Sequence, residues 1–385
     1  MADPRHPARR SHYPLPVIGA SPAPADPSAL FAERLLRIID EGRRIGSYKL
    51  ALLLALLDAS AAESTPSGAA PEVLQTRVIA SHVLRLYLPQ VATFVGRDAG
   101  AATLRQITAR RSPVLDAISA LNDQARHMGC RSVAEMAGRL PEAFERTLDV
   151  IELTFARYPL RLLQVVGGQD LPFLYDIDWG EGVSLRRLHA DGGGLVRFHP
   201  GAADALVRLG PLMRPLVETH WTRMVATLNG IDLEEERLRA HLFGASRRSF
   251  PRKLRARLGD LHDGRCFYCA GPLGSSWDLD HVIPWSRHPN DAIENLVPAD
   301  RRCNTAKSDS LPAVGHVARW RNGHVARAED LAGLADSTGW LSDLEHTLAV
   351  VRSTYRYLPV GTPLWKSVGS VEAYQGRSPS IPGHG

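Results

Sequence analysis

The sequence is poor in cysteine, with only four in 385 residues. A secreted, disulfide-stabilised protein of this length would normally carry more, so a reducing compartment is expected. Long hydrophobic runs are also missing, because the longest, Leu50 to Leu57, has eight residues and a membrane-spanning helix needs roughly 20. The first 26 residues are rich in proline and contain no apolar stretch of the signal-peptide kind. These absences favour a soluble, cytoplasmic protein without a membrane segment.

The composition is that of a folded protein. Hydrophobic residues make up 44% and charged residues 23% of the chain, which excludes global disorder. The length is more than one compact core usually holds, so two or three domains are expected. The formal net charge of +5 permits a polyanionic partner without requiring one.

Helical periodicity dominates the chain, and the predicted fold class is mainly α with a small α+β insert. The helix predicted over Tyr48 to Ala62 is apolar on nearly all sides, which indicates a buried position. Composition and periodicity divide the chain into a disordered proline-rich tail (1–26), a helical domain (27–166), a connecting region with a hairpin and a long helix (167–245), a compact module (246–312), C-terminal helices (313–366) and a flexible tail (367–385).

Three of the four cysteines lie close together in the sequence. Cys266 and Cys269 form a Cys-x2-Cys pair, and Asp300-x2-Cys303 follows after 30 residues. Two pairs with this spacing are typical of a structural zinc site. A carboxylate replaces the usual fourth cysteine or histidine, so the fourth ligand is either Asp300 or a nearby histidine such as His262.

The segment between the two pairs predicts a small α/β unit. Residues 277–285 alternate and contain β-branched side chains, which indicates a strand ending near His281. Asn295 to Val297 fits a returning strand, and Asp300 to Lys307 fits a short helix. The expected order is therefore strand, loop, strand and helix, held by zinc.

The polar residues of this unit resemble a known signature. Asp280-His281, Asn295 and Asn304 are similar to the motif of the HNH endonucleases in its His-Asn-Asn form, and the surrounding segments DHVIPWSR and NLVPADRRCN are typical of zinc-bearing members. The resemblance covers about residues 262–312 and implies a ββα-metal fold. It also implies a metal-dependent endonuclease that cleaves phosphodiester bonds in DNA.

The resemblance implies a role for each matching residue. His281 is expected to act as the general base, which suits an imidazole. Asp280 and Asn304 are expected to hold one catalytic Mg²⁺ or Mn²⁺, since these ions prefer oxygen ligands. Asn295 matches the asparagine that fixes the loop and helps to orient the base. Zinc would then be structural and Mg²⁺ catalytic.

A basic strip directly precedes this unit. Residues 246–257 contain six cations and no acid, which suits sequence-independent contact with a phosphate backbone, although a solvated helix face has the same pattern. The expected nucleic-acid contacts are Arg247, Arg248, Arg252, Lys253, Arg255 and Arg257 in the strip, and Arg301, Arg302 and Lys307 in the short helix.

The sequence therefore predicts a nuclease whose partner is nucleic acid, with double-stranded DNA as the first choice. Modules of this kind commonly serve in bacterial restriction or phage defence, which is the expected setting. Two alternatives stay open. One is an RNA-cleaving enzyme with the same module, because a metal site of this kind reads only a phosphate. The other is a zinc-stabilised protein that binds nucleic acid without cleaving it.

Overall fold

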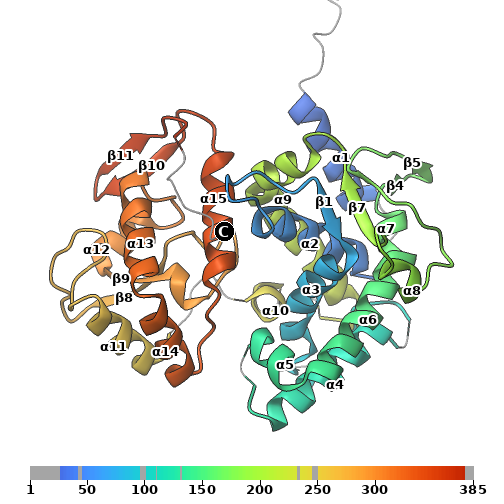
Figure 1. The fold of residues 1–385 in the computed structure, drawn as a ribbon, viewed down its shortest axis with the longest axis horizontal. Coiled ribbons are helices and arrows are strands. Elements are labelled where there is room, and N and C mark those ends of the chain that lie inside the picture. The colour runs from blue at the N-terminus through green and yellow to red at the C-terminus, as the bar shows by residue number, and fades with distance from the viewer. Residues whose placement is uncertain are drawn as a thin grey trace, which may run out of the picture.

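The chain folds into two lobes that lie side by side (Figure 1). The structure is a computed structural model, and it describes residues 27–41, 46–95, 101–109, 111–130, 132–231, 235–244 and 250–377. The first lobe is helical and contains α1 to α10. The second contains α11 to α15 with the strands β8 to β11, and we call it the C-terminal lobe. The proline-rich segment 1–26 lies outside the described residues.

The helical lobe is a bundle with a few short strands. Its helices are α1 (Pro27–Glu41), α2 (Tyr48–Ala62), α3 (Thr76–Tyr87), α4 (Pro113–His127), α5 (Val133–Arg139), α6 (Pro141–Arg157), α7 (Pro159–Leu162), α8 (Leu185–Leu188), α9 (Ala202–Asn229) and α10 (Glu235–Phe243), with the 3-10 turn η1 (Leu88–Val91) after α3. Its strands are β1 (Val73–Gln75), β2 (Phe94–Val95), β3 (Ala101–Ala102), β4 (Val165–Val166), β5 (Gln169–Asp170), β6 (Tyr175–Asp176) and β7 (Leu195–Phe198).

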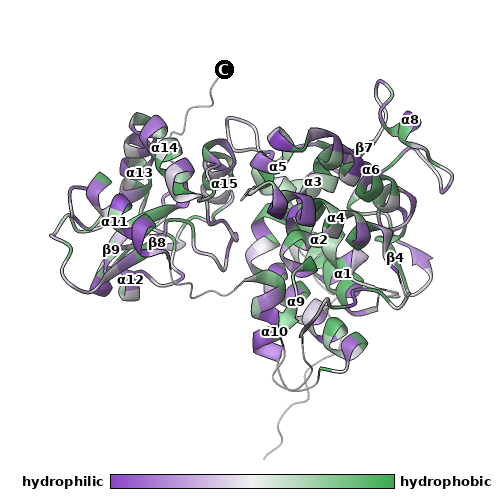
Figure 2. Cartoon of the chain, turned by 90° about the horizontal axis from the view of Figure 1, so that it is seen from below, coloured by the Kyte–Doolittle hydropathy of each residue, from purple (hydrophilic) through white to green (hydrophobic). Residues whose placement is uncertain are grey.

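Helix α2 forms the centre of this lobe. The sequence is apolar around the whole helix, and residues 50–57 are all buried. Helices α3 and α9 pack against it, and the hydrophobic residues concentrate on these inner elements (Figure 2). A helix without a polar face needs cover on every side, which explains why the rest of the lobe surrounds α2.

The region after residue 167 departs from a simple hairpin. Strands β6 and β7 pair antiparallel, with Tyr175 opposite Phe198, but α8 lies in the connection between them. The other edge of β7 pairs with β1, which produces a three-stranded sheet in the order β1-β7-β6. The long helix predicted after this region is present as α9, with Pro211 and Pro215 inside it.

The C-terminal lobe packs short helices around two hairpins. Its elements are α11 (Arg252–Leu261), β8 (Trp277–His281), the 3-10 turn η2 (Ile293–Asn295), β9 (Leu296–Asp300), α12 (Arg301–Lys307), α13 (Val314–Ala326), α14 (Ala328–Thr338), α15 (Leu344–Arg356), β10 (Pro363–Ser367) and β11 (Ser370–Ala373). Its larger buried cluster includes Trp320, Tyr355 and Leu364, so the lobe has a core of its own.

The C-terminal hairpin is a correction to the sequence prediction. Residues 367–385 read as a flexible tail because they are rich in glycine, serine and proline, yet β10 and β11 pair antiparallel over 363–373. Gly369 adopts a positive φ of 74° in the turn between them. The hairpin is held because Leu364 and Trp365 are buried and Trp365 exchanges backbone hydrogen bonds with Leu311 and Ala313. Residues 378–385 lie outside the described part.

The two lobes contact each other along α15. Ser64 Oγ donates to the Ala349 carbonyl at 3.0 Å, and the Ala70 amide donates to the Tyr357 hydroxyl at 2.9 Å. The predicted fold class, mainly α with a small α+β insert, is confirmed. Within the described ranges, no helix combines the length and the apolar character that crossing a membrane requires.

The buried histidines of the C-terminal lobe predict a loss of stability in acid. Burial lowers the pKa of His324 to about 3 and that of His346 to about 4, whereas an unfolded histidine titrates near 6.5. Between these values the unfolded chain binds more protons, so the free energy of unfolding falls as the pH falls from about 6.5 towards 4. The slope is about 1.4 kcal/mol per pH unit for each histidine.

Thermal unfolding between pH 8 and pH 5 measures this effect. The Tm is expected to stay level above pH 7 and to fall progressively below pH 6.5. His346→Asn is the control, because removing one titrating group should make the acid slope shallower. A Tm that is constant from pH 8 to pH 5 would contradict the prediction.

Candidate active site and metal cluster

The candidate site is built on β8, β9 and α12. The two strands pair antiparallel, with Trp277 opposite Asp300 and His281 opposite Leu296. Helix α12 begins immediately after β9, because the Asp300 side chain caps it by accepting a hydrogen bond from the Cys303 amide at 3.0 Å. The predicted order of strand, loop, strand and helix is therefore present, and it brings the end of β8 against α12.

Asp280 is held at the end of β8 by a buried network. Its side chain is only 8% exposed, and its Oδ2 atom accepts hydrogen bonds from Lys307 Nζ at 2.9 Å and from the Tyr268 hydroxyl at 2.5 Å. Lys307 also donates to the His281 carbonyl at 2.8 Å. A buried carboxylate needs such partners, and here they fix the position of the Asp280-His281 pair.

This network corrects one prediction. Lys307 is suggested by the sequence as a phosphate contact, but its side chain is completely buried. The ammonium group binds the Asp280 carboxylate and the His281 carbonyl, so it holds these two residues in position and does not contact a phosphate.

His281 lies at the surface end of the same strand. Its Nε2 atom is 2.9 Å from Asp291 Oδ1, and both side chains are largely buried. The imidazole is flanked by Phe250 and Trp285, with ring centroids 5.8 and 5.7 Å away. Asp291 lies in the loop between β8 and β9 and was not among the residues predicted from the sequence. No motif marks it, and only the fold of the loop brings it to His281.

Asn295 closes that loop. It is 1% exposed and uses both ends of its amide. Its Oδ1 accepts from the Ile283 amide at 2.9 Å, and its Nδ2 donates to the carbonyls of Ile283 and Asn290 at 3.1 and 3.0 Å. The side chain therefore acts on the loop that carries Asp291, and it makes no direct contact with the imidazole of His281.

Asp280 and Asn304 offer oxygen atoms that have no protein partner. Among the described residues, neither Asp280 Oδ1 nor the Asn304 side chain makes a hydrogen bond. Asn304 lies three residues before Lys307 on α12, so the two share a helix face. Since Lys307 contacts Asp280, this face is turned towards the end of β8. A carboxylate and an amide oxygen are suitable ligands for a hard divalent cation such as Mg²⁺.

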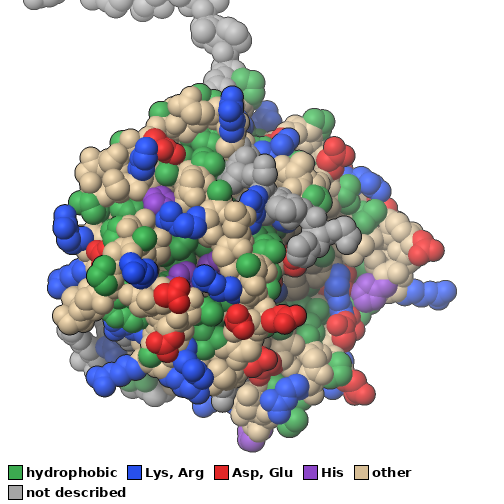
Figure 3. Space-filling view, turned by 60° about the vertical axis from the view of Figure 1, so that its left-hand side comes forward, with side chains coloured by type: hydrophobic (Ala, Val, Ile, Leu, Met, Phe, Trp, Pro, Cys, Tyr) green, Lys and Arg blue, Asp and Glu red, His purple; other side chains and the backbone are tan. Residues whose placement is uncertain are grey.

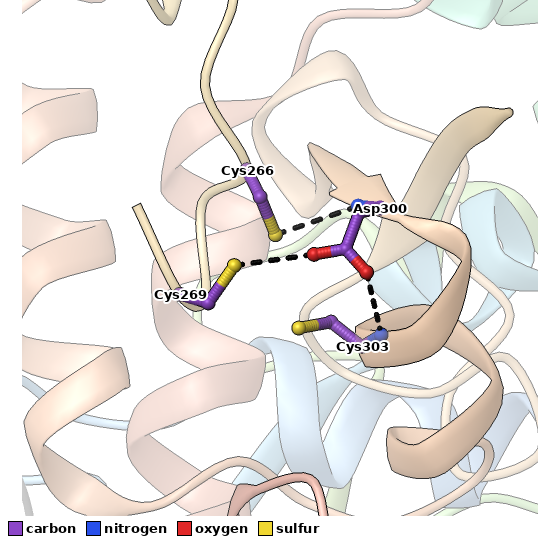
Figure 4. Close-up of side chains that lie close together, drawn as sticks. All are labelled: Cys266, Cys269, Asp300 and Cys303. Carbon is purple, nitrogen blue, oxygen red and sulfur yellow. Dashed lines mark hydrogen bonds between the residues drawn. The ribbon is translucent and has the colours of Figure 1, made fainter. Parts of the chain in front are cut away.

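The cysteines form a second cluster at the start of α12. Cys266 and Cys269 come from the loop before β8, and Asp300 and Cys303 come from the start of α12 (Figure 4). The three sulfur atoms and a carboxylate oxygen lie within 4.8 Å of one another. Cys269 Sγ is 3.1 Å from Asp300 Oδ2, and the Asp300 amide donates to Cys266 Sγ at 3.4 Å.

The chemistry of this cluster fits zinc. Burial raises the pKa of Cys266 and, together with the Asp300 carboxylate, that of Cys303. Without a cation these thiols stay protonated, whereas a bound divalent ion favours the thiolate form that zinc requires. The cluster contains Asp300 and does not contain His262. The His262 ring packs against Phe267 instead, with the ring centroids 6.2 Å apart. Asp300 is thus the fourth residue that the fold offers.

One segment of the chain matches a protein-family model. Residues 270–313 match the family model of the HNH endonucleases. This segment, which we call the HNH module, contains β8, β9 and α12 and every residue of the candidate active site on them. Cys266 and Cys269 lie just before it. No curated protein matches the chain. The HNH module supports a nuclease-type hydrolase that depends on metal and acts on nucleic acid.

The basic strip before the HNH module is divided by the fold. Arg247 and Arg248 lie outside the described residues. Lys253 Nζ donates to the Ser337 carbonyl at 2.8 Å, and Arg255 stacks on Trp277 at 4.7 Å. These two cations therefore bind other residues of the same lobe. Neither a strip of free phosphate contacts nor a fully solvated helix face predicts such contacts. The exposed cations of α11 and α12 are Arg252, Lys253, Arg257, Arg301 and Arg302, and of these Lys253 donates to the Ser337 carbonyl.

On the face that Figure 3 shows, the basic side chains of the described residues are scattered. Lys and Arg side chains are spread over much of the visible face and are interspersed with a smaller number of acidic side chains (Figure 3). Such a distribution favours several separate phosphate contacts over one continuous track.

Proposed function

We propose that the protein is a metal-dependent HNH endonuclease that hydrolyses phosphodiester bonds in double-stranded DNA. One observation carries the proposal. The His281-Asp291 pair lies at the end of β8, next to Asp280, whose second carboxylate oxygen has no partner in the described chain. A base and a place for a hard cation are the two elements that phosphodiester hydrolysis needs at one phosphate.

His281 would act as the general base. Asp291 accepts a hydrogen bond from Nε2 of the imidazole, which selects the tautomer with an unprotonated Nδ1. That nitrogen can take a proton from the water that attacks phosphorus. Asp291 also stabilises the imidazolium that results, because its carboxylate remains 2.9 Å away. Asn295 holds the loop that supplies Asp291, so its role is positioning.

Asp280 and Asn304 would hold the catalytic cation. Mg²⁺ or Mn²⁺ bound there would neutralise charge on the phosphate and on the leaving oxygen. Tyr268 and Lys307 restrain one carboxylate oxygen of Asp280 and leave the other free to bind. Zinc held by Cys266, Cys269, Asp300 and Cys303 would join the loop before β8 to α12 and keep this geometry.

Double-stranded DNA is our first choice of substrate, and the exposed cations support contact with the phosphate backbone of a nucleic acid. Arg252 and Arg257 on α11 and Arg301 and Arg302 on α12 are exposed, and they are not tied into the core. Contacts of this kind bind phosphate without reading sequence. Restriction or phage defence is the biological setting that we propose for such an activity.

The substrate class is tested by offering both polymers. Purified protein is incubated with Mg²⁺ and either plasmid DNA or a long structured RNA, and the products are resolved on gels. We expect the DNA to be cut, with RNA cleaved at least tenfold more slowly. Cleavage of RNA alone would overturn the choice of DNA, and cleavage of neither would favour a binding protein without turnover.

A further inference from the structure

A cavity of about 530 Å³ lies between the two lobes, directly beside the candidate active site. Trp285, Asp291 and His346 line it from the C-terminal lobe, and Arg85 and Ala134 line it from α3 and α5 of the helical lobe. It adjoins the site because Asp291 is the partner of His281 and because the Trp285 ring lies 5.7 Å from the His281 ring. We call it the interlobe pocket.

The charges of the interlobe pocket do not suit a phosphate. Among the described residues, its lining holds two arginines and four carboxylates, and these two cations are already paired: Arg214 with Asp58 and Arg85 with Asp343. The remaining carboxylates are Glu218 and Asp291. A phosphate would therefore meet a surface of negative or compensated charge, and it would gain little there.

The rest of the lining is neutral and partly aromatic. His288 and His346 contribute imidazoles whose Nε2 atoms lie 3.0 Å apart, so one ring donates a hydrogen bond to the other. Burial also lowers the pKa of both rings, that of His346 to about 4. Trp285 adds an aromatic surface, and Leu86 and Leu88 add apolar contacts. Neutral hydrogen-bonding groups with an aromatic wall match the surface of a nucleobase.

We propose that the interlobe pocket receives one unstacked nucleobase of the DNA strand, next to the phosphate that is cleaved. The inference rests on the proposed function. The volume lies within the range of about 300–1,000 Å³ that small-molecule sites occupy. The phosphate stays at the HNH module, while the base turns towards Trp285 and the neutral imidazoles.

This assignment gives the helical lobe a role in substrate selection. The pocket is complete only when both lobes are present, since α3, α5, α9 and α10 form one wall. Enzymes that extrude a base pay a few kcal/mol for unstacking and regain it by stacking and hydrogen bonds in the pocket. A phosphodiester next to a base that fits the pocket is therefore hydrolysed faster than one next to a base that does not fit.

Filling the pocket from the helical lobe tests the inference. Ala134→Trp adds a large side chain at the lining of α5, on the lobe that does not carry the catalytic groups. The matched control is Arg139→Trp, an exposed position on the same helix that does not line the pocket. Each full-length variant is assayed on plasmid DNA and on bis(p-nitrophenyl) phosphate, a phosphodiester that has no base.

For Ala134→Trp, the ratio of DNA cleavage to hydrolysis of bis(p-nitrophenyl) phosphate is expected to fall at least tenfold, the scale of a lost base–aromatic contact. Arg139→Trp is expected to keep the wild-type ratio. A ratio within twofold of wild type for Ala134→Trp overturns the inference. A wild-type protein that hydrolyses neither substrate overturns the proposed function instead, so the two failures are distinguishable.

A second measurement separates base binding from a mere change of lobe geometry. Short duplexes carry a single abasic residue at each position around a mapped cleavage point. One abasic position should slow the wild type about tenfold, and the same position should add no further loss to Trp285→Ala. The inference is wrong if an abasic residue at no position slows cleavage. It is also wrong if the rate losses caused by the abasic residue and by Trp285→Ala multiply when the two changes are combined.

Discussion

His281→Ala is expected to abolish DNA cleavage almost completely, with a loss of about 10²- to 10⁴-fold in rate, the range that general acid–base catalysis supplies. The variant removes the only imidazole that the fold places at the end of β8 with a carboxylate behind it, as far as the described chain extends. The Asp280-Lys307 pair does not depend on this side chain, because Lys307 reaches the His281 carbonyl through the backbone. The fold of the HNH module should therefore survive.

The measurement is the initial rate of plasmid nicking at saturating Mg²⁺, together with DNA binding by filter retention. Binding should stay within a few-fold of wild type, because the exposed arginines are unchanged. Asp291→Asn is a second variant with a smaller expected effect, because the amide keeps the shape of the side chain but cannot stabilise an imidazolium. Its nicking rate should lie between those of wild type and His281→Ala. Equal nicking by wild type and His281→Ala would remove His281 from the chemistry.

Cys266→Ser is expected to unfold or loosen the HNH module, with loss of its zinc. Cys266 is 2% exposed and lies within 4.8 Å of the three other candidate ligands. A structural zinc contributes folding free energy directly, so losing one thiolate removes more than a hydrogen bond. We expect a fall in Tm of about 5 °C or more. Each kcal/mol of lost unfolding free energy lowers the Tm of a domain of about 150–250 residues by about 2–4 °C.

Zinc content by atomic absorption and thermal unfolding measure this prediction together. Cys130→Ser is the matched control, because Cys130 lies in the helical lobe and outside the cluster. It should retain the zinc and a near-wild-type Tm. A Cys266→Ser protein that keeps both its zinc and its Tm would show that the cluster is not a structural zinc site.

The sequence predicts the HNH module well because its signal is local. His281, Asn295 and Asn304 lie within about two dozen residues; His281 and Asn295 each end a short element, and Asn304 lies in the middle of the short helix α12. Helix α2 is equally plain, since apolar residues on every side leave a buried helix as the consistent interpretation. Neither requires knowledge of a distant contact.

The parts that could not be predicted depend on tertiary contacts. Lys307 has the same appearance in the sequence whether it faces phosphate or Asp280, and only the packing of α12 on β8 decides. Asp291 has no motif, and the loop fixed by Asn295 brings it to His281. The β10–β11 hairpin is hidden by its glycine and serine content, and burial of Trp365 holds it in place.

The interlobe pocket illustrates the same limit on a larger scale. Arg85 and Ala134 lie about 150 or more residues before Trp285, and no periodicity links them. Their association follows from the contact of α15 with α2 and α9, which sets the distance between the lobes. A functional role for the helical lobe is therefore visible only once both lobes are folded.

The most direct test of the account is magnesium dependence of cleavage by the intact, zinc-loaded protein. The protein is exchanged into buffer without Mg²⁺, its zinc content is verified, and supercoiled plasmid is added with or without Mg²⁺. We predict nicked and linear DNA only when Mg²⁺ is present, at a constant zinc content. Plasmid that stays supercoiled in both samples, or cleavage of equal rate without any added divalent ion, would contradict the assignment of a metal-dependent DNA endonuclease.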